Sequence, residues 1–296
     1  MHKRRIKMLY TLKNDNLVAQ IDDLGAQIVS VKRGDLEYIW YGDAEFWSGH
    51  APILFPICGR LFEGKYTFEG KEYEMNLHGF ARKTVFDVES ASDTEIVFSL
   101  SSSDTTLAQY PFDFKLTVSY TLTGSKIASK VVIDNRSDKI MPAAFGAHPG
   151  FNVPLDTGSF DDWYIEFPEE CTPNRLIISD AGLLAGSKYA LTLAEGKKIK
   201  LCHALFDKDG IFMDKIPHSV TLASDLSDHS VTLNFPDMSY LGIWHAARTE
   251  APFVCIEPWC GLPALDGQTD DLSTKHDMFH IRPNAQKQLG YEIIFN

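Results

Sequence analysis

The segment at residues 114–124 constrains the fold more than any other part of the chain, because hydrophobic and polar residues alternate strictly through it. The sequence reads FKLTVSYTLTG, with an aromatic or aliphatic residue at every second position. Side chains of a β-strand point to opposite faces in turn, whereas a helix repeats about every 3.6 residues. The segment therefore predicts a strand with one face in a core and the other in water.

Similar alternation recurs along the chain, at residues 95–101, 127–135, 219–226, 230–237 and 290–296. Turn sequences such as KNDN, FEGKEY and TGSK separate the alternating segments. Long helical patterns are missing, and short helices are expected only at 105–110 and 270–279. Many strands joined by turns are typical of an all-β sandwich. With no linker or repeat, the sequence predicts a single large antiparallel β-sandwich domain over residues 1–296, with 1–7 as a flexible extension.

Composition narrows the classes of partner. The chain of 296 residues has a formal net charge of -12 and no stripe of lysine and arginine, so nucleic-acid binding is not expected. The opening MHKRRIKMLYTLKNDN turns polar too soon for a signal peptide or membrane span. Five scattered cysteines without a CxxC pair fit reduced thiols better than disulfides or a zinc site. We expect a cytoplasmic protein that binds no membrane, present as a monomer or homodimer.

Three segments carry side chains that could perform chemistry. The run AFGAHPGFNVP places His148 among apolar residues and glycines, and Arg60, His78 and Arg82 lie among further glycines in residues 55–83. Glu257 follows an apolar run and precedes a proline, so the strand is expected to end at this carboxylate. Taken singly, each histidine is more often a core residue, and the two arginines are ordinarily surface residues. A structural ion pair is as common as a functional role for the glutamate.

His276 and His280 have the i, i+4 spacing of a helical metal pair, but the glutamate that a metalloprotease motif places after the first histidine is absent. No metal is expected there.

The order and context of the four motifs are more specific than any one residue. Arg60 in GRLFEGKY, His78 in NLHGF, His148 in AHPGFN and Glu257 in CIEPW resemble the aldose 1-epimerase, or galactose mutarotase-like, family. The resemblance extends over nearly the whole chain. It implies a β-supersandwich with a sugar-binding concave face, Glu257 as general base and His148 as general acid. It also implies that His78, Arg60 and an aspartate hold the sugar hydroxyls.

The resemblance favours Asp209 in DGIF for that aspartate, and Asp207 stays open as the alternative. The chain departs from the galactose-acting members at Gly59, where they carry asparagine, and at Gly150, where they carry an aromatic residue. Phe80 replaces a second glycine and gives HGFAR, which is more similar to the LacX-type and hexose-6-phosphate 1-epimerase branch. In that branch arginines near the first histidine clamp a phosphate, so Arg82 is a candidate anion-binding residue.

The chemistry that the resemblance implies suits these residue types. To interconvert α and β anomers, a base removes the proton of the C1 hydroxyl while an acid protonates the ring oxygen, and the ring opens to an aldehyde. Glutamate can accept this proton, and histidine can donate one and be regenerated when the ring closes. No metal, nucleotide or redox cofactor is required.

Three alternatives to an aldose 1-epimerase acting on a free hexose stay open. The substrate could be a hexose 6-phosphate. Glu257 and Asp209 could be the two carboxylates of a glycosidase, although the resemblance supplies a histidine as the catalytic acid. A non-catalytic sugar sensor could use the same face, with Trp244 and Trp259 stacking on the sugar.

Overall fold

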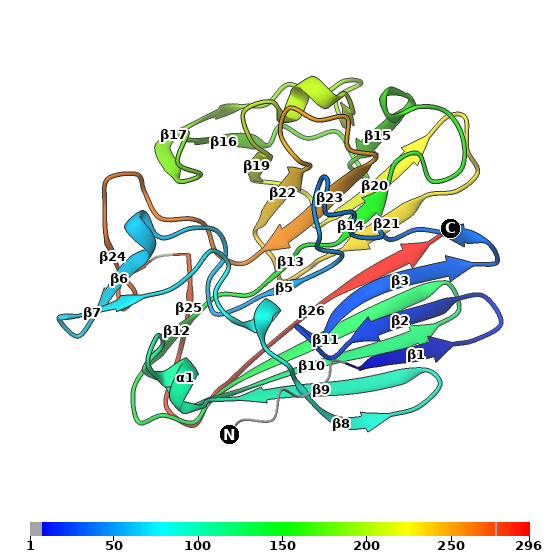
Figure 1. Cartoon of the computed structure of the whole chain (residues 1–296). Coiled ribbons are helices and arrows are strands. Elements are labelled where there is room, and N and C mark those ends of the chain that lie inside the picture. Colours follow the sequence, from blue (N-terminus) through cyan, green and yellow to red (C-terminus); the bar gives the residue numbers. More distant parts are fainter. Residues whose placement is uncertain (1–7, 276) are drawn as a thin grey trace.

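The computed structural model describes residues 8–275 and 277–296, and it is built almost entirely from antiparallel strands (Figure 1). The largest sheet has nine strands in the order β18-β15-β20-β21-β26-β11-β10-β9-β8. Its members in chain order are β8 (Asp87–Ala91), β9 (Glu95–Ser101), β10 (Phe114–Thr123), β11 (Lys126–Asn135), β15 (Trp163–Glu166), β18 (Lys198–Lys200), β20 (Ser219–Ser224), β21 (Val231–Asn234) and β26 (Gln286–Phe295).

An eight-stranded sheet carries the candidate site. Its order is β17-β16-β19-β22-β23-β13-β5, and β14 pairs with β23 beside this path. The strands are β5 (Ile53–Leu54), β13 (Gly146–Ala147), β14 (Gly150–Asn152), β16 (Asn174–Ile178), β17 (Leu184–Ala190), β19 (Ile211–Asp214), β22 (Tyr240–Trp244) and β23 (Phe253–Trp259).

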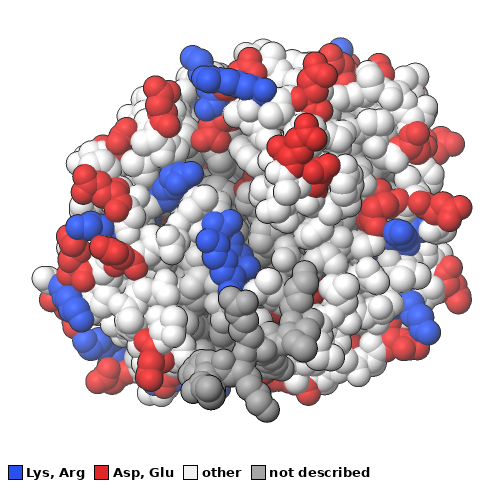
Figure 2. All heavy atoms as spheres, viewed as in Figure 1, with Lys and Arg blue, Asp and Glu red and all other residues white. Residues whose placement is uncertain are grey.

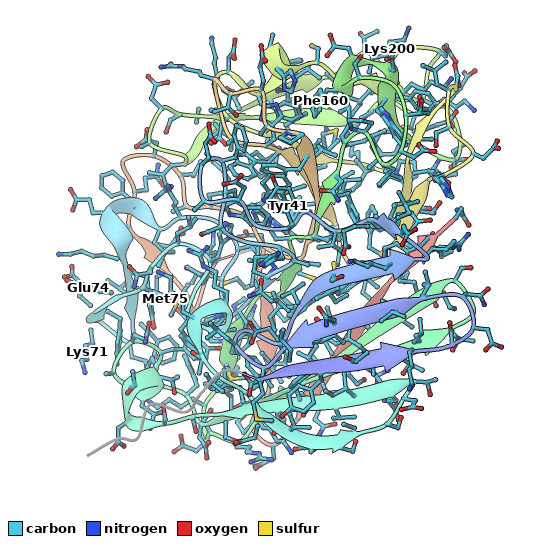
Figure 3. The ribbon with its side chains drawn as sticks, turned by 45° about the vertical axis from the view of Figure 1, so that its right-hand side comes forward. Tyr41, Lys71, Glu74, Met75, Phe160 and Lys200 are labelled. Carbon is cyan, nitrogen blue, oxygen red and sulfur yellow. The ribbon has the colours of Figure 1, made fainter. Side chains whose placement is uncertain are left out.

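Three small sheets complete the fold. A four-stranded meander lies beside β9–β11 in Figure 1, and it contains β1 (Leu9–Lys13), β2 (Val18–Asp22), β3 (Gln27–Arg33) and β4 (Leu36–Glu37). A two-stranded sheet pairs β12 (Met141–Ala143) with β25 (Phe279–Ile281), and a three-stranded sheet contains β24 (Asp270–Asp271), β6 (Lys65–Phe68) and β7 (Lys71–Glu74). The hairpin of β6 and β7 carries Lys71 and Glu74 outward from the body of the molecule (Figure 3).

The alternating segments form strands as predicted. In β10 every second residue from Phe114 to Leu122 is buried, and the residues between them are half-buried. Two aromatic residues of this strand join it to other layers. The Phe114 ring lies 5.2 Å from the ring of Phe55, which follows β5, and the Tyr120 hydroxyl donates to the carbonyl of Ala26 at 2.8 Å. The all-β sandwich with few short helices is thus confirmed.

The two predicted helices had different outcomes. Helix α1 (Asp104–Leu107) lies at the first, and the Ser103 hydroxyl caps it by accepting from the Thr106 amide. The helix expected at 270–279 is wrong, since the described part of that segment contains β24, turns and the first residue of β25. The Leu272 amide bonds to the carbonyl of Thr67, so pairing with β6 replaces a local helix.

The surface carries charges of both signs. Figure 2 shows acidic groups spread over the viewed face with basic groups scattered among them. No helix in the described residues is long and apolar enough to cross a membrane. The extension expected at residues 1–7 lies outside the described residues, and the expectation of a single domain from residue 1 to 296 stays a prediction.

Candidate active site

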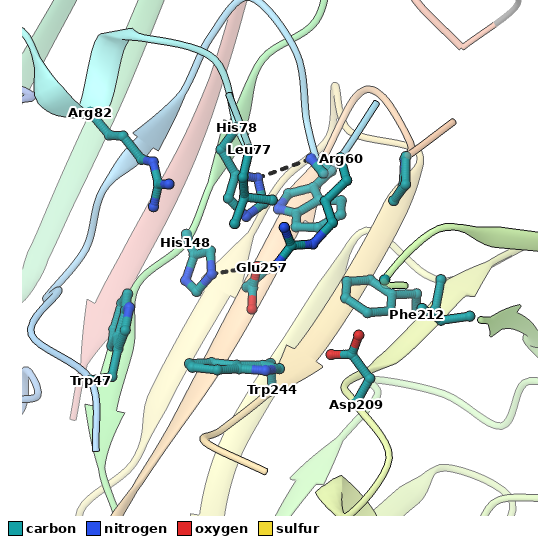
Figure 4. Close-up of a pocket in the computed structure, with 15 residues that line it drawn as sticks. Trp47, Arg60, Leu77, His78, Arg82, His148, Asp209, Phe212, Trp244 and Glu257 are labelled. Carbon is teal, nitrogen blue, oxygen red and sulfur yellow. Dashed lines mark hydrogen bonds and ion pairs between the residues drawn. The ribbon is translucent and has the colours of Figure 1, made fainter. Parts of the chain in front are cut away.

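All six residues singled out from the sequence line one pocket of about 260 Å³ on the eight-stranded sheet (Figure 4). They are Arg60, His78, Arg82, His148, Asp209 and Glu257. Asp207, the other aspartate considered, is exposed and does not line it. The pocket thus brings together two cations, two carboxyl groups and two imidazoles from segments far apart in the chain.

Glu257 lies on β23, in which every residue is buried, and the carboxyl side chain is almost inaccessible to solvent. The expectation that the strand ends at Glu257 is wrong, since Pro258 continues it in register with β22. The reason lies on the other edge of β23. The Ile256 amide donates to the carbonyl of Pro149, and the Cys260 amide donates to the carbonyl of Phe145. Alternate residues of a strand point their amides to the same side, so an amide at residue 258 would also face this segment, between those two hydrogen bonds. The missing proline donor therefore faces the interruption between β13 and β14.

His148 stands in that interruption. Its amide donates to the carbonyl of Pro52, and the next carbonyl, of Pro149, accepts from Ile256, so the backbone on both sides of the imidazole is fixed. Pro149 has no amide hydrogen to pair and restricts the turn. The His148 Nε2 atom lies 3.1 Å from Oε2 of Glu257. The histidine and the glutamate identified from separate motifs therefore form one contact pair.

Burial disfavours the charged form of both side chains of this pair. It raises the pKa of Glu257 well above the ordinary value, and Asp209 adds to the rise. Burial also lowers the pKa of His148 to about 3, and the positive charge of Arg82 contributes. Both groups thus resist carrying charge separately. Both shifts favour an uncharged pair, in which Glu257 carries the proton beside a neutral His148.

His78 presents a neutral imidazole to the pocket. Its Nδ1 accepts from the Gly59 amide at 2.9 Å, while its own amide donates to the Gly59 carbonyl at 2.9 Å. Burial lowers the pKa of His78 well below the ordinary value, with His148 and the arginines adding to the effect. A neutral ring that accepts at Nδ1 carries its proton on Nε2. His78 can therefore donate a hydrogen bond to a hydroxyl oxygen of a ligand.

Arg60 and Arg82 supply the positive charge of the pocket. Neither has a carboxylate within 4.0 Å among residues 8–275 and 277–296, and Nε of Arg82 is buried without a hydrogen-bond partner there. Burial and Arg60 lower the pKa of Arg82, but a guanidinium stays charged at neutral pH. Arg60 lies against Gly182, where a Cβ atom would come within 2.9 Å of its Nε. These arginines can bind hydroxyl or anionic oxygens of a ligand.

The remaining walls are acidic and aromatic. Asp209 accepts from the Gly210 amide at 2.7 Å, and burial raises its pKa. Trp244 and Trp259, considered from the sequence, both line the pocket. Sequence reasoning missed Trp47 and Phe212, which line it as well. The only signal for Trp47 was a tryptophan in the polar loop sequence EFWSGH, which does not reveal its neighbours.

The described residues also contain one group of possible metal ligands at this site. Side-chain atoms of His148, Cys255 and Glu257 lie within 4.8 Å of one another. The cysteine is buried, and burial together with Glu257 raises its pKa well above the ordinary value, which opposes the thiolate that a metal would need. Of the histidine pair considered for a metal, His280 bonds through Nε2 to the Ser273 carbonyl at 3.0 Å, and residue 276 lies outside the described part. The expectation that no metal or cofactor is required stays a prediction.

Fold and pocket together define a class, the galactose mutarotase-like β-sandwich proteins. A galactose mutarotase related enzyme from Lactobacillus acidophilus superimposes with a TM-score of 0.93 at 34% identity, covering 98% of this chain and 97% of that one. A galactose mutarotase-like protein from Lactobacillus casei gives 0.92 at 36% identity, covering 98% and 100%.

Sequence comparison identifies the family. The chain belongs to the aldose 1-epimerase family, whose model matches residues 8–170. The LacX protein encoded on a plasmid of Lactococcus lactis is 34% identical over 97% of this chain and 99% of its own length. The chain is thus a carbohydrate epimerase by family, and its substrate class is a sugar. The expected cytoplasmic location and the monomeric or homodimeric state stay predictions.

Proposed function

We propose that this protein is an aldose 1-epimerase that interconverts the α and β anomers of a hexose, with Glu257 as general base and His148 as general acid. The observation that carries the proposal is the 3.1 Å contact of these two side chains on the wall of a pocket large enough for a sugar. The C1 hydroxyl oxygen and the ring oxygen are both bonded to C1. A base and an acid that act on them must therefore stand side by side, as these two groups do.

The single proton held by the pair matches the proton balance of the reaction. In the reactive form Glu257 is a carboxylate and His148 an imidazolium. Glu257 removes the proton of the C1 hydroxyl while His148 donates its proton to the ring oxygen, and the bond from C1 to the ring oxygen breaks. The pair is then neutral, with the proton on Glu257. After rotation about the bond from C1 to C2, closure returns each proton along the reverse path and yields the other anomer.

The other polar groups of the pocket hold the sugar while its ring is open. His78 donates from Nε2, Asp209 accepts from hydroxyl groups, and Arg60 donates to their oxygens. Fixing the hydroxyls of C2 and beyond keeps the aldehyde carbon beside the pair while it rotates. This division of labour requires a neutral His78, which agrees with the lowered pKa of that ring.

The test is polarimetry of freshly dissolved α-D-glucose and α-D-galactose with wild-type protein and with Glu257→Gln. We expect wild type to accelerate the approach to anomeric equilibrium and the variant to lose about 10²- to 10⁴-fold of that rate, the usual contribution of a general base. Glu250→Gln, at an exposed glutamate outside the pocket, is the matched control and should keep the wild-type rate. Sugar binding without exchange would identify a sensor, and release of reducing sugar from an aryl glycoside would identify a glycosidase.

A second candidate, a hexose-6-phosphate 1-epimerase, is favoured by one observation, the two pocket arginines without a carboxylate partner in the described residues. Guanidinium groups match phosphate oxygens in pairs of hydrogen bonds. The same assay with α-D-glucose 6-phosphate separates the candidates. If the phosphorylated sugar is preferred, Arg82→Gln should raise the KM for that sugar and leave the KM for free glucose nearly unchanged. Equal KM values in wild type and variant would exclude this role for Arg82.

A further inference from the structure

The His148 ring lacks the hydrogen bond that usually orients a catalytic imidazole. Nε2 meets Glu257, but Nδ1 is buried, and apart from the backbone of His148 itself no group among residues 8–275 and 277–296 bonds to it. A histidine that transfers a proton is ordinarily held by a carbonyl or carboxylate on its second nitrogen. Something else must therefore fix the plane of this ring.

Aromatic side chains surround the imidazole instead. Trp47 stacks on it, with ring centroids 5.0 Å apart and an angle of 27° between the planes. The rings of His78 and Trp244 meet it edge-on, at 5.6 Å and 5.9 Å. Of these three rings Trp47 alone lies nearly parallel to the imidazole, and Figure 4 shows it on the side of His148 away from Arg60.

Hydrogen bonds within its own loop hold the backbone of Trp47 in place. The Trp47 amide donates to the carbonyl of Asp43, and its carbonyl accepts from Nε1 of Trp40, both at 2.8 Å. Its ring also stacks on Phe253 at 5.7 Å with an angle of 22°. The indole is therefore fixed by backbone and ring contacts before any ligand enters.

Two glycines provide the space for this indole. A Cβ atom on Gly49 would come within 2.4 Å of the Trp47 ring, and one on Gly150 within 3.0 Å. Any larger side chain at residue 150 would displace the indole from His148. The absence of side chains at these two positions is thus part of how the stack is built.

We propose that Trp47 is a positioning residue for His148, whose indole face sets the plane of the imidazole and stabilises its protonated form. The proposal rests on the proposed function, because it assigns how the acid of that reaction is oriented. Burial and Arg82 disfavour the imidazolium. The negative face of an indole attracts a cation, by more when the pair is shielded from water. The stack therefore opposes the cost of charging His148 and aims Nε2 at the sugar ring oxygen.

The experiment compares Trp47→Leu, which fills the site without a π face, with Trp47→Phe, which restores one. Phe46→Leu is the matched control, because Phe46 lies on the same loop and packs on Trp40 outside the pocket. We expect Trp47→Leu to lower kcat for anomer exchange about 30-fold, the size of a shielded cation–π interaction, with KM changed less than twofold. Trp47→Phe should recover most of kcat, and Phe46→Leu should resemble wild type.

A second measurement does not depend on activity. The ring protons of His148, assigned in NMR spectra by their loss in His148→Asn, should be shifted upfield by the indole ring current in wild type and lose that shift in Trp47→Leu. An unchanged kcat and unchanged His148 shifts in a folded Trp47→Leu protein would overturn the proposal. A rise in KM alone would also overturn it, because Trp47 would then be a sugar platform. If wild type exchanges no anomers, the proposed function fails, and the NMR shifts still decide whether Trp47 orients His148.

Discussion

The shared proton of Glu257 and His148 leads to a specific pH dependence on the acid side. If Glu257 were an ordinary carboxylate with a pKa of 4.5, activity would fall as it becomes protonated. Its ionised fraction would drop from about 97% at pH 6 to about 24% at pH 4, a loss of about fourfold. In the proposed mechanism a buried pair behaves differently, because one proton on the pair is the active form rather than an inactivating one.

The expected pH dependence of kcat/KM follows from the directions in which the pKa values of Glu257 and His148 are shifted. Burial raises the pKa of Glu257, so the pair gains its first proton at a pH well above 4.5 and keeps it as the pH falls. Burial lowers the pKa of His148 to about 3, so the second proton, which leaves no base, binds only near that pH. At pH 4 about 90% of the molecules would still carry one proton on the pair. We therefore expect kcat/KM to fall by much less than fourfold between pH 6 and pH 4.

Polarimetry between pH 4 and pH 6, corrected for the spontaneous reaction at each pH, measures this ratio. Circular dichroism of the same samples establishes that the protein stays folded throughout. A fourfold loss of kcat/KM at pH 4 in folded protein would refute the shared proton and would assign Glu257 an ordinary pKa.

Two further predictions follow from named contacts. Asp209→Asn removes a negative charge that raises the pKa of Glu257, so the alkaline limit of kcat/KM should move to lower pH, while the lost hydroxyl acceptor raises KM; a pH profile identical to wild type would contradict this. Asn135→Ala leaves the carbonyls of Lys139 and Ile281 without their donor inside the protein, so urea unfolding should show a loss of about 2–4 kcal/mol. A loss under 0.5 kcal/mol would mean that neither bond contributes.

The sequence predicted those strands that have one buried face and one face toward solvent. Strand β10 alternates because one side meets the core and the other meets solvent. Strand β23 is buried throughout, so no alternation marks its length, and the prediction ended it one residue before Pro258. Whether a proline fits a strand depends on what its missing donor faces. Here that is the gap beside His148, which lies more than 100 residues earlier in the sequence.

The candidate site was predicted to the extent that motifs mark it. Arg60, His78, His148 and Glu257 stand in recognisable local sequences, and the structure places them in one pocket. Trp47 has no such motif. Its position over His148 depends on Gly150 and on the loop that it closes, and only the packed structure shows both.

The place of β26 in the large sheet has a consequence for how the protein is made. This strand, Gln286–Phe295, pairs with β11 on one side and with β21 on the other. Strands β8 to β11 and strands β15, β18, β20 and β21 are all synthesised before it, and it alone joins the two sets within the sheet. Until β26 leaves the ribosome, each set presents an open edge at which another nascent chain could pair. The open edges of both halves are therefore covered only when β26 pairs with them. A translation product truncated before β26 would keep both edges open and would be prone to aggregate.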